Sequence, residues 1–142
     1  MKHSLPLRAL SRLLQYPDLE LMEHLPEVAA ALYEMPKLSK KVQVGLEEFV
    51  NNLEASDLMD SQENYVECFD RGRATSLHLF EHVHGDSRER GQAMVDLLQT
   101  YKEGGLQLSA NELPDHLSII LEFASTLPLD QAKQFVGEMA HI

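Results

Sequence analysis

Three histidines lie close together near the middle of the chain: His78, His82 and His84, with Glu81 between the first two. On a helix, His78 and His82 would face the same way one turn apart, and such a pair can bind zinc. The HExxH pattern of zinc hydrolases is absent, and no cysteine completes a set of ligands. Because histidines on a half-buried helix more often bond to backbone or carboxylate groups, we expect no metal site.

Cys68 is the only cysteine in the sequence, so it can form no internal disulfide, which agrees with a reducing compartment. It could pair with a histidine as a nucleophile, but the acidic residues around it disfavour the thiolate. The glycine-rich loops that cradle phosphates and the dinucleotide-binding fingerprint are also missing. The sequence therefore gives no positive argument for an enzyme or for a bound cofactor.

The residues that could form a specific surface gather between Tyr65 and Met94. This stretch carries a tyrosine, two phenylalanines, four arginines, three histidines and three glycines. A run that passes from helix to loop to helix with aromatic and charged side chains is where a small helical protein would hold a binding surface. We therefore expect the function to centre on this stretch.

The chain of 142 residues has the size of one domain, and its formal net charge is −11. This acidic excess argues against nucleic-acid binding, which needs Lys and Arg, and suits a basic partner. The N-terminus lacks the apolar core of a signal peptide, and no apolar run approaches the ~18 residues of a membrane span. We expect a cytoplasmic protein without membrane insertion.

Composition and periodicity predict an all-α fold for residues 1–142, a single helical domain of about six to eight helices. Leu, Met and Ala are plentiful, Trp is absent, and the β-branched clusters typical of strands are missing. The clearest helix follows Ser39, where apolar residues recur with a 3.6-residue period. These residues are Val42, Leu46, Phe49, Val50 and Leu53.

Cap residues, prolines and glycines mark the other predicted helices. A helix from Ser61 should end at Phe69, and a short one should run from Thr75 to Val83. The next should begin at Asp86 and end in a left-handed C-cap at Gly104-Gly105. The remaining predicted starts are Ser4, with Pro6 in the first turn, Asp18, Pro26, Ser109 and Asp130.

The predicted helix after Ser109 has Pro114 in its first turn, where proline is tolerated. Its apolar residues repeat with the period seen after Ser39, which predicts a deeply packed helix. Four polar side chains would share its outer face: Asp115, Ser118, Glu122 and Ser125.

Three runs carry a resemblance to a known family: FDRGRATSLHLFEHVHGDSRERGQAMVDLL, the opening LSRLLQYPD, and the later LPDHLSIILEFAS. Together they closely resemble the delta subunit of respiratory nitrate reductase, the NarJ family. The resemblance covers essentially the whole chain from Leu5 to Met139, and the first run is long enough to be specific.

The resemblance implies an all-helical cytoplasmic chaperone related to the TorD and DmsD redox-enzyme maturation proteins. Family members bind the N-terminus of the catalytic alpha subunit, a vestigial twin-arginine segment, and keep the apoenzyme competent for molybdenum cofactor insertion. The resemblance leaves room for contact with molybdenum cofactor biosynthesis proteins. Members usually continue well beyond Ile142, where the apolar pattern still runs, which favours a chain truncated at its C-terminus.

A host for a basic amphipathic segment needs an apolar groove with acidic edges. Hydrophobic burial would supply most of the affinity, while carboxylates would select for arginines and speed encounter. We predict a groove lined by Tyr65, Phe69, Leu79, Phe80, Met94 and Tyr101. The predicted acidic rim and LPDH motif comprise Asp70, Glu81, Asp86, Asp115, His116 and Glu122, with Asp115 and His116 the best candidates for peptide contact because they match motif positions of the family.

Other interpretations stay open at this point. Each aromatic residue could belong to an ordinary core, and Asp115 could cap a helix. The chain could be a general scaffolding module that binds many basic helices alike, which a scrambled peptide would reveal. It could also be a small metalloprotein that uses His78, His82 and His84, and would then carry stoichiometric zinc or iron.

Overall fold

The computed structural model describes residues 4–34, 38–71, 75–83, 88–109 and 111–139. These residues form helices and loops, with one isolated antiparallel bridge between His78 and His116. The predicted all-α class is confirmed. The elements are α1 (Ser4–Leu13), α2 (Leu19–Glu23), α3 (Leu25–Leu32), α4 (Lys40–Ala55), α5 (Leu58–Tyr65), the π-helix η1 (Val66–Asp70), α6 (Phe80–Val83), α7 (Arg88–Glu103), α8 (Leu117–Ser125) and α9 (Leu129–Met139).

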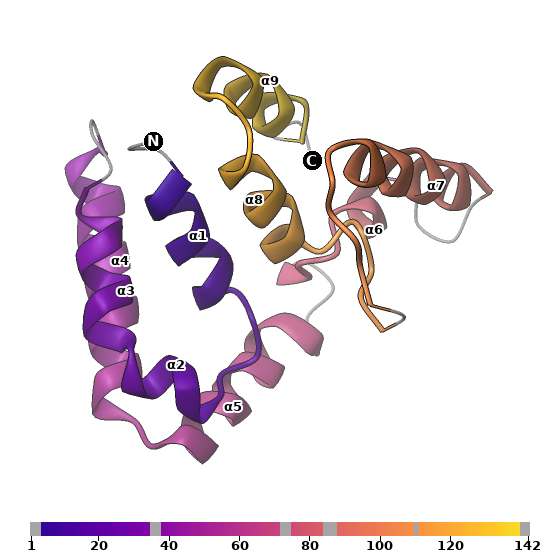
Figure 1. Ribbon diagram of the computed structural model, residues 1–142. Coiled ribbons are helices and arrows are strands. Elements are labelled where there is room, and N and C mark those ends of the chain that lie inside the picture. Colours follow the sequence, from indigo (N-terminus) through magenta and orange to yellow (C-terminus); the bar gives the residue numbers. More distant parts are fainter. Residues whose placement is uncertain (1–3, 35–37, 72–74, 84–87, 110, 140–142) are drawn as a thin grey trace.

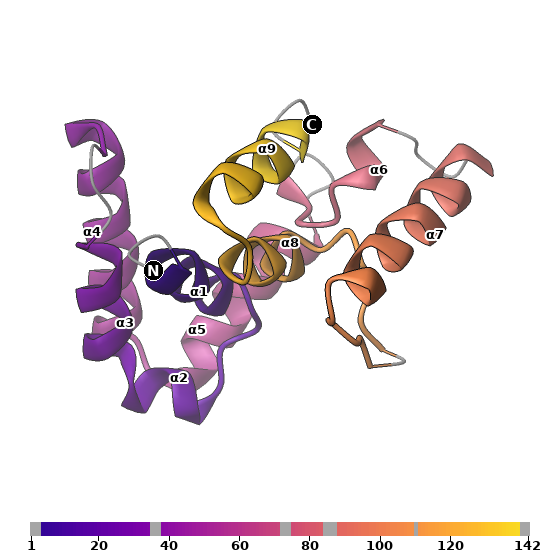
Figure 2. The ribbon, with the colours of Figure 1, turned by 45° about the horizontal axis from the view of Figure 1, so that its top comes forward.

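Helix α1 lies between two groups of helices, as both ribbon views show (Figure 1, Figure 2). On one side it packs against α3, and these helices share a core with α2 and α4 that includes Leu13 and Leu32. On the other side it packs against α8. The second core joins α6 to α9 around Ile120, Phe123 and Phe135. Helix α1 therefore connects the two cores.

Local sequence signals set several helix starts. Asp18 precedes α2 in extended conformation, and its carboxylate accepts a hydrogen bond from the Leu21 amide at 2.8 Å. Ser39 caps α4 in the same way through the Val42 amide. Both predicted caps are confirmed, because a side-chain oxygen replaces the partner that the first amides of a helix lack.

Helix α8 is buried almost all round. Ser118 and Ser125, which we expected on an outer face, are only 5% and 6% exposed, and of the four predicted polar positions only Glu122 reaches solvent. The Ser11 hydroxyl of α1 donates to the Ser118 carbonyl at 2.6 Å, and the Ser118 hydroxyl lies 2.7 Å from Nδ1 of His116, so both buried hydroxyl groups have partners. The predicted outer face is wrong, because α1 covers α8 at Ser118 and the segment before α6 covers Asp115.

Helix α8 also begins later than predicted, at Leu117 instead of near Ser109. The preceding backbone pairs with the segment before α6: the Leu79 amide donates to the Asp115 carbonyl at 3.1 Å, and the Leu117 amide donates to the Leu77 carbonyl at 2.8 Å. These long-range bonds use groups that a helix would have paired internally. We call residues 77–80 and 113–117 the bridge segments.

The middle of the chain differs from its predicted helices. The helix predicted from Ser61 to Phe69 is α5, capped by Asp57, followed by the π-helix η1. The helix predicted from Thr75 to Val83 is reduced to α6, because the residues before it belong to the bridge segments. The predicted start at Asp86 lies outside the described residues.

Helix α7 ends as predicted, in a left-handed glycine. Gly105 has a φ of +88°, and the Leu106 amide donates to the Tyr101 carbonyl at 2.8 Å. This is the hydrogen bond that closes a Schellman-type C-terminus. Gly104 is needed for a different reason, since an added Cβ would lie 2.5 Å from Cε1 of Phe123.

We predict that Gly104→Ala lowers the free energy of unfolding by about 1–3 kcal/mol, because the buried Phe123 ring must shift to admit the methyl group. Gly91→Ala in the same helix is the matched control, since its Cβ would meet nothing within 4 Å. The control should gain ~0.5–1 kcal/mol from better helix propensity. Urea unfolding measures both, and equal stability of the two variants would contradict the close contact.

Candidate functional site

Two neighbouring pockets share Tyr65 as a lining residue. The first, which we call the apolar pocket, has a volume of about 290 Å³. It is lined by Leu13, Pro17, Phe49, Asn52, Leu53, Ser56, Ser61, Asn64, Tyr65, Cys68 and Phe69. The second, the polar pocket, has a volume of about 620 Å³. It is lined by Gln15, Tyr16, Tyr65, His78, Asn111, Glu112, Leu113, His116, Ser118, Ile119 and Glu122.

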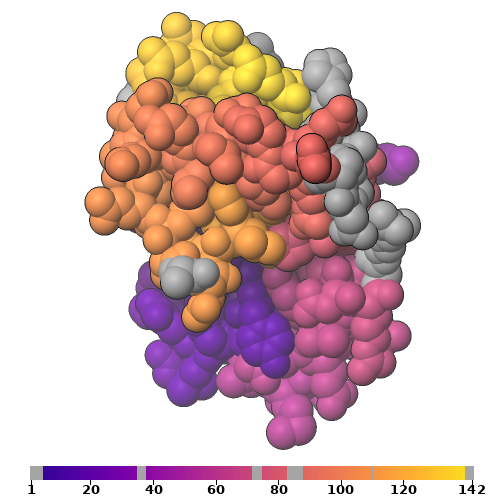
Figure 3. All heavy atoms as spheres, turned by 90° about the vertical axis from the view of Figure 1, so that its right-hand side faces the viewer, coloured from indigo at the N-terminus to yellow at the C-terminus, as the bar shows by residue number. Residues whose placement is uncertain are grey.

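The polar pocket forms where several parts of the chain meet. They are the residues after α1, the end of α5, the bridge segment before α6, the loop that leads from α7 into α8, and α8 itself. Figure 3 shows a face on which the indigo-to-purple, magenta and orange segments adjoin. Residues far apart in sequence therefore contribute to one surface.

Tyr65 is held firmly between the two pockets. Its hydroxyl donates to the Leu14 carbonyl at 2.8 Å, and its ring meets the rings of Tyr16 and Phe69 edge-on at centroid distances of 5.7 and 5.0 Å. Burial, with a smaller effect of the Asp70 charge, raises the pKa of Tyr65 to about 12, so the phenol stays neutral. These contacts hold the Tyr65 side chain in one position between the two pockets. It lies where α5 gives way to a π-helix, a feature often found at functional sites.

The six predicted groove residues do not form one groove. Tyr65 and Phe69 line the apolar pocket together, while Phe80 and Tyr101 are core residues, 7% and 0% exposed. Tyr101 is buried because its hydroxyl donates to the Pro114 carbonyl at 2.7 Å and its ring packs on Phe123. Two further predicted groove residues are partly buried against the same core: Leu79 and Met94.

Asp115 is fully buried, with 0% exposure, and so is not part of an exposed rim. Its Oδ2 accepts a hydrogen bond from the Phe80 amide at 3.0 Å. Its Oδ1 lies 3.5 Å from Nδ1 of His78, and neither of these two atoms has a closer partner among the described residues. A carboxylate can be buried here because it receives a backbone donor and faces a basic ring. The Asp115 side chain therefore links the two bridge segments.

The pKa values of the two histidines in the bridge segments, His78 and His116, shift in opposite directions. The Asp115 carboxylate raises the pKa of His78 above its ordinary value, although burial opposes this. Burial lowers the pKa of His116, and the nearby His78 adds to the effect. The two rings lie 5.0 Å apart, and Nδ1 of His116 accepts from the Ser118 amide at 3.2 Å as the N-cap of α8. His116 thus supports the helix start while lining the polar pocket.

The other predicted rim residues are scattered. Asp70 is exposed at the end of η1, and Glu81 pairs with Arg90 at 3.6 Å. Glu122 is exposed and lines the polar pocket. Asp86 lies outside the described residues. The structure therefore joins Glu122 and His116 in one site and leaves Asp70 and Glu81 apart from that pocket's lining.

Sequence reasoning missed several residues of both pockets. Phe49, 36% exposed, was assigned to the core stripe of α4, yet its helix packs only towards its C-terminal end. Tyr16 and Pro17 lie in the LSRLLQYPD run, whose resemblance to the family was the available signal. Glu112 also lines the polar pocket.

The geometry assumed for a zinc pair is wrong, because His78 lies in a bridge segment before α6 and not on the helix of His82. The ring Nε2 of His82 instead lies 2.9 Å from the Ser76 carbonyl. Within the described ranges, no group of three or more His, Cys, Asp and Glu side chains could hold a metal ion. Cys68 is exposed and borders the apolar pocket.

We predict that Asp115→Asn lowers the pKa of His78, since the amide keeps an acceptor for Phe80 but loses the charge that favours imidazolium. A raised folded-state pKa stabilises the fold below the unfolded value of 6.5, and this contribution is lost as pH rises through the folded value. The variant should therefore be destabilised more at about pH 5 than at about pH 8. Ring-proton NMR titration measures the pKa, and an unchanged His78 value would contradict the pairing.

Comparison with known proteins supports the sequence resemblance. Residues 34–141 match the family described as nitrate reductase delta subunit. The chain is 50% identical over 132 residues to NarJ of Escherichia coli K12, named a nitrate reductase molybdenum cofactor assembly chaperone, covering 93% of this chain and 56% of that protein. It is 48% identical over 136 residues to NarW of the same organism, covering 96% and 56%. The chain thus spans a little over half the length of these relatives.

A more distant relative is NarJ of Bacillus subtilis 168, 33% identical over 125 residues, covering 88% of this chain and 67% of that protein. The fold is similar to the crystal structure of an Archaeoglobus fulgidus protein assigned to redox enzyme maturation, with a TM-score of 0.62 and 24% identity over 99% of this chain and 81% of that one. The sequence matches and this shared fold agree, and the chain belongs to the nitrate reductase delta subunit family.

Proposed function

We propose that this chain is a single-domain cytoplasmic chaperone for nitrate reductase. It binds the basic amphipathic N-terminal segment of the alpha subunit and supports molybdenum cofactor insertion before the enzyme is assembled. Family membership and the names of the relatives support the client and the process. The observation that carries the binding role is the adjoining pair of pockets, one apolar and one edged by carboxylates, with Tyr65 as the common wall.

The apolar pocket suits the apolar face of a short helix. Its lining combines aliphatic and aromatic side chains from α1, α4 and the α5–η1 segment, and several of these are only partly buried. Filling it with side chains spaced one turn apart would remove apolar surface of both partners from water. Burial of this kind would supply most of the affinity.

The charge of the chain suits the basic face of the same helix. The formal net charge of −11 attracts a cationic segment and increases the rate of encounter. We first expected Asp115 to contact the basic segment, but Asp115 is buried. Glu112 and Glu122 are the carboxylates for this contact, because both are exposed at the polar pocket.

We predict one-to-one binding of a peptide of the first ~15 residues of the alpha subunit, with a negative heat-capacity change from apolar burial. Asn52→Trp should weaken this binding by about tenfold or more, because the indole would occupy the apolar pocket that Asn52 lines. Titration calorimetry measures both effects.

Asn51→Trp is the matched control, since Asn51 is the preceding exposed residue of α4 and lies outside the pocket lining. It should bind like the unmodified protein. A scrambled peptide of the same composition tests the alternative of a general binder of basic helices. Equal affinity for both peptides, or equal loss in both tryptophan variants, would count against the proposed function at this pocket.

A further inference from the structure

The polar pocket combines two kinds of groups that attract cations. Glu112 comes from the loop before α8 and Glu122 from α8 itself, so two carboxylates reach the pocket from separate positions. Tyr16 and Tyr65 add two aromatic rings, whose faces carry negative electrostatic potential. Carboxylates beside aromatic rings favour a planar guanidinium over a compact ammonium, because guanidinium is weakly hydrated and stacks on rings.

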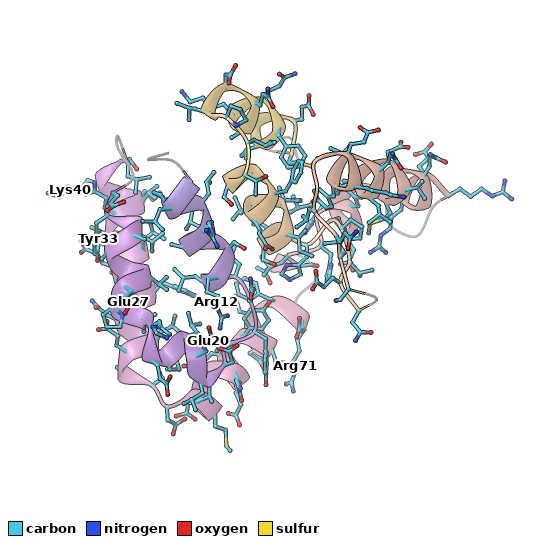
Figure 4. All side chains as sticks on the ribbon, in the orientation of Figure 1. Arg12, Glu20, Glu27, Tyr33, Lys40 and Arg71 are labelled. Atoms are coloured by element: carbon cyan, nitrogen blue, oxygen red, sulfur yellow. The ribbon has the colours of Figure 1, made fainter. Side chains whose placement is uncertain are left out.

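Both glutamate side chains are exposed, and neither has an ion pair or a side-chain hydrogen bond with another described residue. Among the described residues, no Lys or Arg lines the pocket. The two arginines labelled in Figure 4 have other partners, because Arg12 pairs with Asp18 and Arg71 pairs with Glu67 at 3.1 Å. The negative charge of the pocket is therefore available to a ligand.

The histidines beside the pocket do not cancel its preference for a cationic ligand. Burial lowers the pKa of His116, which keeps its ring neutral near pH 7. His78 has a raised pKa, but the buried Asp115 carboxylate next to it balances its charge when it is protonated.

We propose that the polar pocket is a subsite for one arginine side chain of the basic client segment. The guanidinium stacks on the ring of Tyr16 or Tyr65 and pairs with Glu112 and Glu122, while the apolar face of the same segment enters the neighbouring apolar pocket. The volume of about 620 Å³ admits the side chain together with adjoining peptide backbone. This inference rests on the proposed function and assigns the charged half of its binding site.

The experiment compares the alpha-subunit peptide with a version in which every arginine is replaced by citrulline, a neutral side chain of nearly the same shape. The unmodified protein should bind the citrulline peptide about tenfold more weakly. The double variant Glu112→Gln/Glu122→Gln should lose this discrimination, binding both peptides with the weaker affinity. Glu47→Gln/Glu48→Gln, an exposed pair on α4 outside both pockets, makes the same change of net charge and should retain the discrimination.

Each outcome separates the two proposals. Equal binding of the two peptides by the unmodified protein overturns the arginine subsite and leaves the proposed function standing. Discrimination that persists in the Glu112/Glu122 variant also overturns the subsite, because the cation must then bind elsewhere. Loss of discrimination in both double variants assigns it to net charge and overturns the subsite as well. If neither peptide binds, the proposed function fails and the subsite fails with it. Thermal unfolding confirms that the variants are folded.

Discussion

The buried carboxylate of Asp115 is the interaction on which this structure depends. It accepts a hydrogen bond from the Phe80 amide and faces His78, while its own backbone carbonyl accepts from the Leu79 amide. A buried charged group without partners would cost several kcal/mol, so these contacts must form together. They fix the bridge segments against each other and thereby determine where α6 and α8 begin.

The position of α8 then organises both cores. With its start fixed at Leu117, α8 lies against α1 on one side and α9 on another, and its apolar residues fill the second core. Helix α1 contributes to both cores and leads into Tyr16, which lines the polar pocket, and Pro17, which lines the apolar pocket. Because the Tyr65 hydroxyl donates to the Leu14 carbonyl, the α5–η1 segment is attached to the same end of α1. Both pockets result from this arrangement.

Under the proposed function, a host for a basic amphipathic helix performs two tasks, and the two pockets divide them. One pocket offers apolar surface and the other offers carboxylates, and the ring of Tyr65 belongs to both. A ligand that places apolar and cationic side chains on neighbouring faces can fill both pockets at once, whereas a purely apolar or purely charged peptide fills one. Selectivity would thus come from the distance and orientation between the pockets, which the buried bridge holds constant.

The sequence by itself determined the helical class and many local boundaries. The caps Asp18 and Ser39 and the left-handed Gly105 are decided by side-chain oxygens and backbone freedom within a few residues, so local patterns identify them. The long motif runs also pointed to the family that the comparisons show. At these positions local information sufficed, because the deciding partner lies a few residues away in the chain.

Only the tertiary structure decided which polar residues are buried and which aromatic residues face a pocket. Asp115 and Glu122 look alike as acids on a predicted helix, yet one bonds to an amide 35 residues away in sequence and is sealed, while the other stays in solvent. Tyr65 and Tyr101 likewise differ only in what packs on them, the end of α1 in one case and the second core in the other. Burial depends on contacts between distant segments, and a periodic pattern identifies the apolar side of a helix without saying how many of its sides are covered.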